Sequence, residues 1–248
     1  MSRASAARGL ILPGVLSLAA LAVLITLGNW QMQRLSWKEN LIATISARVN
    51  EPVRVLPAAA TWPSFEIDAN EYRAFFARGR FRHQNEVQVY TVLSEPKGSF
   101  GGAGYWVLTP FELEDGGIVI VNRGFVPQEL KNPASRAEGQ TEGIVRIAGL
   151  LRAREQPNYF TPTNDLAKNA WYRRDPAAIA HAFDLKNVAP FMLDATGEYR
   201  PDMLPQPNET KLTFTNNHLG YALTWYGLAC TLIGVFTAFA WQRLRGAR

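Results

Sequence analysis

The sequence has little of the chemistry that hydrolytic enzymes and disulfide-bonded proteins use. Among its 248 residues there are one cysteine, Cys230, and three histidines, His83, His181 and His218. A single cysteine cannot form an intramolecular disulfide, so the fold must be stabilised by burial of a core. Neither a G-x-S-x-G nor an H-E-x-x-H motif occurs, which leaves hydrolytic catalysis with little support. We predict that the protein is not an enzyme.

Acidic side chains are absent from both ends of the sequence, before Glu39 and after Glu209. Five basic residues lie in the two tails outside the apolar runs, before residue 10 and after residue 241: Arg3, Arg8, Arg243, Arg245 and Arg248. They account for the formal net charge of +5, because basic and acidic side chains balance between residues 33 and 217. Short basic segments stay on the cytoplasmic side of a membrane. The charge therefore predicts a membrane topology and not nucleic-acid binding.

Two uncharged apolar runs, residues 10–32 and 219–241, are each 23 residues long, and a helix needs about 20 to cross a bilayer. A cleaved signal peptide is the alternative for the first run, but its length and the end Gly28–Met32 favour a retained anchor. We expect a multi-pass protein of a bacterial inner membrane with both termini cytoplasmic and the central region periplasmic. The predicted segments are a tail (1–9), a transmembrane helix (10–32), a periplasmic β-rich domain (33–217), a second transmembrane helix (218–241) and a tail (242–248).

Aromatic and β-branched residues predict several strands in the central region. These are residues 72–81, 86–93, 105–111, 118–126, 144–152 and 190–194. Residues 112–117 end in two glycines that suit positive φ, so the strands on either side are predicted to form a hairpin. Residues 97–104 are glycine-rich but lack the Lys and hydroxyl of a phosphate loop, which favours a mobile hairpin connection.

Helical signals are fewer in this region. Residues 34–47 continue the first apolar run with helical spacing and predict an amphipathic stalk. Asp175 and Pro176 suit the N-cap and first position of a helix that runs through Phe183. The predicted fold class is an α+β membrane protein, in which two transmembrane helices flank a mostly antiparallel β extracytoplasmic domain with one or two helices. A barrel and a sandwich both stay open.

The start of the second apolar run carries two helical faces. At about 100° per residue, His218, Tyr221 and Trp225 point within about 60° of one another. The opposite face has glycines at seven-residue spacing, and the first run has two more at a multiple of that spacing: Gly220, Gly227 and Gly234, with Gly14 and Gly28. Small residues let membrane helices approach closely. We expect the glycine face to pack against the first run, and the His–Tyr–Trp face to meet lipid, the domain or another protein.

His218 is the candidate metal ligand. A neutral imidazole is a common ligand of haem iron, and the rings of Tyr221 and Trp225 would suit an apolar macrocycle. The alternative is that the aromatic residues are ordinary interface anchors and that His218 binds a headgroup or caps the helix. His83 and His181 have no Cys or His at metal spacing, so structural or solvated roles are expected for them.

Residues 28–38, G-N-W-Q-M-Q-R-L-S-W-K, resemble the end of the first span in the surfeit locus protein one family. Three further segments resemble the family in the expected order: 104–111, G-Y-W-V-L-T-P-F; 121–127, V-N-R-G-F-V-P; and 217–229, N-H-L-G-Y-A-L-T-W-Y-G-L-A. The family more often has Trp where Phe125 stands and Gln where Gly220 stands.

The resemblance implies an assembly factor for haem-copper cytochrome c oxidase that binds haem a and helps to insert it into the catalytic subunit. It implies His218 as the iron ligand with Trp225 contributing, whereas Tyr221 is added by helical geometry. The expected partners are the catalytic subunit, haem a synthase and the lipid bilayer. Arg34 and Lys38 are candidates by position for contacts to the haem carboxylates, and a plain surface role is equally open.

A competing hypothesis is a protein scaffold that stabilises oxidase assembly intermediates without binding haem. In this hypothesis residues 122–127 and the loop 98–104 organise the domain to hold oxidase subunits. Residues 122–127 are explained more simply as a strand end with a structural glycine.

Overall fold

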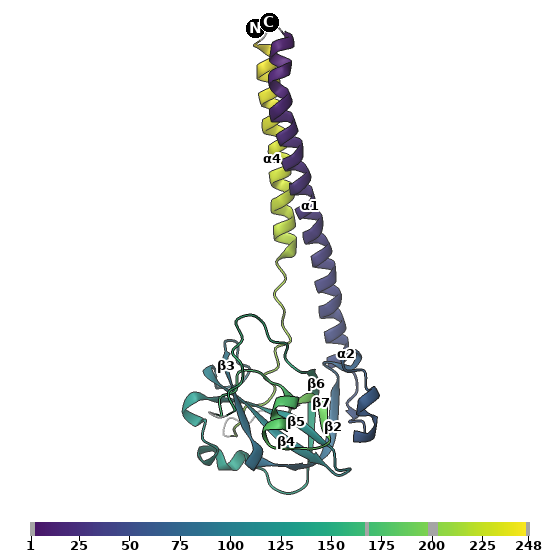
Figure 1. The fold of residues 1–248 in the computed structure, drawn as a ribbon, viewed down its shortest axis with the longest axis vertical. Coiled ribbons are helices and arrows are strands. Elements are labelled where there is room, and N and C mark those ends of the chain that lie inside the picture. The colour runs from purple at the N-terminus through teal and green to yellow at the C-terminus, as the bar shows by residue number, and fades with distance from the viewer. Residues whose placement is uncertain (1–2, 167–168, 198–202, 247–248) are drawn as a thin grey trace. The chain divides into compact units, whose positions relative to one another are not determined.

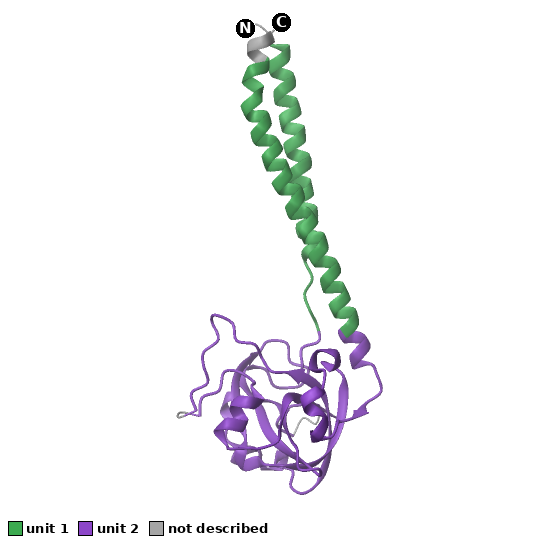
Figure 2. Ribbon diagram, turned by 45° about the vertical axis from the view of Figure 1, so that its right-hand side comes forward, with its two compact units in different colours: residues 1–44, 213–248 green, residues 45–212 purple. Residues whose placement is uncertain are grey.

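The computed structural model describes residues 3–166, 169–197 and 203–246. The chain forms two compact units, one of residues 1–44 and 213–248 and the other of residues 45–212 (Figure 2). The first unit contains most of helix α1, Arg3–Val49, and all of helix α4, His218–Arg245. Both helices are long and apolar enough to cross a membrane. Two terminal helices that flank a β-rich domain confirm the predicted fold class.

Helix α1 has no break where the apolar run ends. It continues through residues 34–47 to Val49, which confirms the predicted continuation of the helix. Pro52 follows closely, and a proline ring disfavours helical geometry in the residue before it. Helix α1 is therefore one element in which an apolar part leads directly into a part that carries charge.

Helices α1 and α4 lie antiparallel and side by side within the first unit (Figures 1 and 2). The side of α1 that is least exposed advances in steps of three and four residues: Leu10, Gly14, Ser17, Leu21, Leu24, Gly28 and Gln31. On α4 the corresponding residues are His218, Ala222, Trp225, Ala229, Leu232 and Phe236. This spacing is typical of paired helices that pack at a small crossing angle.

The second unit is built on a seven-stranded sheet. Its strands are β1 Arg54–Val55, β2 Ala74–Phe81, β3 Val87–Leu93, β4 Gly102–Leu113, β5 Ile118–Pro127, β6 Val145–Ala153 and β7 Val188–Thr196. The order is β1-β2-β6-β7-β5-β4-β3, and a further pairing joins β2 to β4. That pairing closes β2, β6, β7, β5 and β4 into a ring. The domain is therefore a barrel and not a sandwich.

Most neighbouring strands are antiparallel, as predicted. The exceptions are β1 with β2 and β5 with β7, which are parallel. Strands β4 and β5 form the predicted hairpin. In its turn the Leu113 and Gly117 backbones are hydrogen-bonded, and Gly116 has a φ of +84°. Gly116 takes the backbone conformation that only glycine adopts without strain.

Alternate residues of the strands enter separate cores, of which the two largest lie inside and outside the barrel. One core fills the barrel with side chains from all five ring strands, including Phe75, Phe111, Val121, Leu151 and Phe191. The other covers the outer face, where Ile120 and Met192 pack against Trp171 and Ile179. Ile179 belongs to helix α3, Pro176–Ala182, and a shorter helix, α2, spans Ile67–Asn70. The carboxylate of Asp175 accepts from the Ala177 and Ala178 amides, which confirms the predicted N-cap.

The glycine-rich segment 97–104 lies in the hairpin of β3 and β4, with Gly102–Gly104 already part of β4, which confirms the predicted hairpin but not its predicted mobility. Its backbone is hydrogen-bonded to two buried side chains that lie more than 100 residues further along the chain. The amides of Lys97 and Gly98 donate to the Glu209 carboxylate, and the Phe100 amide donates to the Gln206 amide oxygen. Gln206 and Glu209 thus give this loop a fixed attachment to the barrel.

A buried carboxylate, Asp194 of β7, is surrounded by hydrogen-bond donors and cations. Its oxygens lie 3.0 Å from Arg174 Nη1 and 3.7 Å from Arg152 Nη1, and they accept from Asn122 and Thr210. Burial alone would raise the pKa of Asp194, but the two guanidinium groups and the hydrogen bonds outweigh it. The pKa of Asp194 lies below its usual value as a result.

Candidate functional site

His218 is the first residue of α4, and its position is fixed from α1. Its Nδ1 atom lies 2.7 Å from Oε1 of Gln31. Gln31 is only 9% exposed although it belongs to a helix whose surface is mostly open. An amide oxygen can only accept a hydrogen bond, so Nδ1 of His218 carries the proton. The neutral imidazole then keeps its lone pair on Nε2.

Nε2 of His218 has no hydrogen-bond partner among the described residues. A ring nitrogen in this state is the one that binds a metal, and a hydrogen bond from the other ring nitrogen fixes the tautomer and the ring orientation. The described residues contain no group of three or more His, Cys, Asp or Glu side chains that could hold a metal ion. A single imidazole nitrogen as donor suits a metal that carries most of its own ligands, as haem iron does.

A second polar pair joins the helices below the histidine. Tyr226 donates its hydroxyl to Oδ1 of Asn29 at 2.7 Å. The ring of Tyr226 lies against Gly28, where an added Cβ would come within 2.5 Å of Cε1. Glycine at position 28 thus leaves the room that the tyrosine ring occupies. The two pairs hold α4 in one rotation relative to α1.

The predicted packing face of α4 is wrong. A Cβ added to Gly220, Gly227 or Gly234 would meet no atom within 4 Å, so this face is open. Ala222 and Ala229, also seven residues apart, are 0% and 5% exposed and lie on the packed side with His218. Alanine is small enough for close approach, and only this rotation lets His218 and Tyr226 reach Gln31 and Asn29. On α1 the prediction is confirmed, since Gly14 and Gly28 contact Phe236 and Tyr226.

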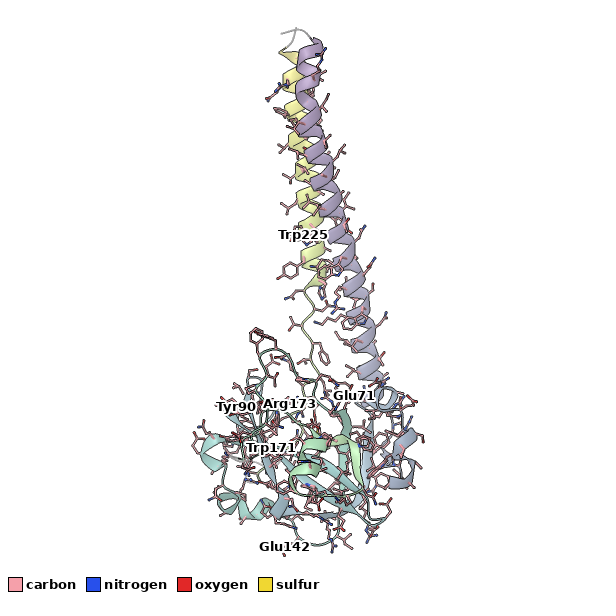
Figure 3. The ribbon with its side chains drawn as sticks, viewed as in Figure 1. Glu71, Tyr90, Glu142, Trp171, Arg173 and Trp225 are labelled. Carbon is pink, nitrogen blue, oxygen red and sulfur yellow. The ribbon has the colours of Figure 1, made fainter. Side chains whose placement is uncertain are left out.

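The structure separates the predicted aromatic neighbours of His218. Trp225 of α4 (Figure 3) is half-buried on the packed side, whereas Tyr221 is 58% exposed at its edge. Tyr221 and Leu219, which is 49% exposed, therefore present apolar surface next to the imidazole. A flat apolar ligand could cover this surface, and lipid could do so as well.

The two predicted basic residues follow Gln31 on α1. Lys38 donates its ammonium group to the backbone carbonyl of Thr215, just before α4. The Arg34 guanidinium lies 4.1 Å from the centroid of the Trp37 ring, a cation–π distance. Arg34 is exposed and keeps its charge available for an anionic group. Lys38 has a structural partner, so it is the weaker candidate.

The other two histidines have the expected structural and exposed positions. Nε2 of His83 lies 2.8 Å from the Thr141 carbonyl, and Nδ1 lies 3.4 Å from Arg123 Nη1. Burial and the charge of Arg136 lower the pKa of Arg123 to about 10, against the opposing effect of Glu86. His181 is exposed on α3.

Sequence comparison decides the family. The family model described as SURF1 family matches residues 18–230. This range includes both Gln31 and His218. The chain belongs to the SURF1 family. Surfeit locus protein 1 of Homo sapiens is 37% identical over 234 residues, which cover 89% of this chain and 74% of that protein.

Two further relatives show similar coverage. Surfeit locus protein 1 of Xenopus tropicalis is 35% identical over 87% of this chain and 70% of its own length. A SURF1-like protein of Monosiga brevicollis is 36% identical over 85% of this chain and 80% of its own. The match to the family model covers the barrel and parts of both terminal helices.

Sequence reasoning missed the partners of His218 and Tyr226. The available signal was the pair of polar residues Asn29 and Gln31 at the end of an otherwise apolar run. Polar side chains at such positions find partners on a neighbouring helix.

Proposed function

We propose that this SURF1-family protein is an assembly factor for haem-copper cytochrome c oxidase that carries haem a at the membrane surface. The observation that carries the proposal is the Gln31–His218 hydrogen bond, which leaves Nε2 of the imidazole free to bind iron. Family membership supports a role in oxidase assembly, as the sequence resemblance implied. The proposed partners are the oxidase catalytic subunit, haem a synthase as the source of the cargo, and lipid.

The proposed binding mode uses one protein ligand at the membrane surface. His218 binds the iron, while Trp225 and Tyr221 contribute aromatic surface. In this binding mode Arg34 attracts the haem carboxylates, a role supported by its exposed guanidinium one helical turn beyond Gln31. A single axial ligand suits a carrier, since loss of one bond releases the cargo to the catalytic subunit.

The proposed topology places the barrel outside the cytoplasm. Arg8 near the start of α1 and Arg243 and Arg245 in the last turn of α4 form the basic end of the helix pair. By the positive-inside rule this end stays cytoplasmic. In a bacterium the barrel would then lie in the periplasm, attached to the inner membrane through both helices.

Haem occupancy of the purified protein tests the proposed function. The chain is co-expressed with the enzymes that make haem a, and haem is quantified per protein chain for the parent and two histidine variants. We expect His218→Ala to lose most of the haem and His181→Ala, at an exposed position, to keep it. Parent protein that is colourless after this co-expression would refute haem carriage and favour the scaffold hypothesis.

A further inference from the structure

The barrel domain exposes two adjacent aromatic side chains almost completely. Tyr159 and Phe160 are 96% and 87% exposed, which is more than any other large hydrophobic side chain of the described residues. Their rings meet edge to face, with centroids 5.3 Å apart and an interplanar angle of 89°. Leaving two large rings in water forgoes the free energy that burial of large apolar side chains contributes. Exposed apolar groups of this kind mark interaction sites.

A short turn presents the two rings. The Phe160 amide donates to the Asn158 side chain, the Thr161 amide donates to the Asn158 carbonyl, and the Asn158 amide donates to the Thr161 hydroxyl. Pro157 and Pro162 flank the turn. These bonds leave the rings pointing away from the chain that supports them. The tip has a defined shape before it meets any partner.

The tip lies at the end of the domain where the chain enters and leaves. Residues 154–166 rise from the barrel on the same side as residues 45 and 212, in both views of the fold (Figures 1 and 2). We call this side the tethered end. Figure 3 labels Glu71 near the tethered end and Glu142 at the opposite end of the domain.

Short connections keep the tethered end near the membrane. From Leu212 to His218 the chain can span only about 20 Å even when fully extended. The helical stretch from Met32 to Ile45 is also about 20 Å long at 1.5 Å per residue. Both connections leave from the tethered end, so this end of the domain is the one joined by short chain to the apolar helices. Lipid is consequently the apolar phase that the chain itself supplies on this side of the domain.

We propose that Tyr159 and Phe160 form a membrane-docking tip that inserts into the headgroup region of the bilayer. Aromatic rings favour this region, and a tyrosine hydroxyl can remain hydrated there. Residues 156–164 carry no charge, so no ionised group has to leave water when the tip inserts. Docking fixes the orientation of the barrel above the lipid. This role is independent of haem binding.

Spin labelling of the full chain in lipid nanodiscs tests the docking. Cys230→Ser removes the single cysteine, and Phe160→Cys or Glu142→Cys then places a nitroxide at the tip or at the opposite end. Oxygen concentrates in lipid, whereas a water-soluble nickel chelate is excluded from it. We expect the logarithm of the ratio of oxygen to nickel collision rates to be positive at residue 160 and negative at residue 142.

Either of two other results would overturn the proposal. A label at residue 160 that collides with nickel as often as the label at residue 142 would show that the tip stays in water. A label at residue 160 that is immobilised and shielded from both reagents would show that protein covers the tip. If the logarithm of the collision-rate ratio at residue 160 is no longer positive when Tyr159→Ser is added, the tyrosine contributes part of the insertion.

Discussion

The imidazole of His218 and the amide of Gln31 lie 2.7 Å apart although 187 residues separate them in the sequence. The entire barrel domain is inserted between these two residues. The contact joins the end of one apolar helix to the start of the other, and it sets the tautomer that leaves Nε2 available. The candidate site is thus a property of the helix pair.

Removal of the Gln31 amide should weaken haem binding without removing the ligand. In Gln31→Leu the His218 ring loses the acceptor that fixes its tautomer and orientation. Outer-shell partners of this kind typically contribute about 10- to 100-fold to affinity, so the Kd for haem should rise by about that factor. Titration of haem into detergent-solubilised protein measures the change. Gln33→Leu, at an exposed position of the same helix, is the matched control, and equal affinities in the two variants would contradict the proposed role.

The packed face of α4 predicts which small residues tolerate enlargement. Ala229→Leu should push α4 away from α1 at a cost of about 1–3 kcal/mol, because Ala229 is 5% exposed. Gly227→Leu should be neutral or mildly stabilising, since no atom lies within 4 Å of an added Cβ. Thermal unfolding of the helices, followed by circular dichroism in detergent, compares the variants. A larger loss of thermal stability in Gly227→Leu than in Ala229→Leu would contradict this assignment and indicate that the glycine face packs against α1.

The barrel should lose stability in acid through Asp194. The pKa of Asp194 is lower in the folded state than its usual value, so its ionised form stabilises the fold above about pH 4. This contribution is lost as the pH falls below about 4 towards the folded-state pKa. The melting temperature measured from pH 7 to pH 3 should therefore fall more steeply in the parent than in Asp194→Asn. At pH 7 the variant should be about 3 kcal/mol less stable, because Arg174 is left partly uncompensated.

Gly124 should resist substitution more strongly than a glycine in an open turn. It has a φ of +129°, and an added Cβ would lie 1.9 Å from the Gln206 carbonyl oxygen. We expect Gly124→Ala to cost about 3 kcal/mol from steric overlap and backbone strain. Gly116→Ala, with a φ of +84° and no atom within 4 Å, should cost only the strain, about 1–2 kcal/mol. Chemical denaturation measures the free energy of unfolding of the two variants. Equal losses in Gly124→Ala and Gly116→Ala would contradict the prediction.

Local signals in the sequence predicted most elements of the barrel. The β-branched residues of 118–126, the glycine turn after Phe111 and the Asp175 cap are local features, and each predicted element was confirmed. Closure of the barrel depends on the pairing of Gly79 with Leu113 and on parallel pairing of β5 with β7. These contacts join segments far apart in the chain, and a period-two pattern fits a barrel and a sandwich equally well.

In the candidate site, too, local patterns predicted only the features that depend on neighbouring residues. Helical periodicity grouped His218, Tyr221 and Trp225 on a face of α4 turned away from α1, whereas the structure has His218 and Trp225 on the packed side and Tyr221 exposed at its edge. Periodicity could not decide which set of small residues on α4 faces α1. The set that contains Gly227 and the set that contains Ala229 have the same seven-residue spacing. The choice depends on polar contacts to Asn29 and Gln31 on another helix, and these are invisible in the pattern of α4 alone.

Rescue by free imidazole is the most direct test of the proposed ligand. A His218→Gly variant, co-expressed with haem a biosynthesis and purified, should lack the Soret band of the parent protein, and purification in the presence of imidazole should restore that band. Full haem occupancy in His218→Gly without added imidazole would show that this histidine does not bind the iron.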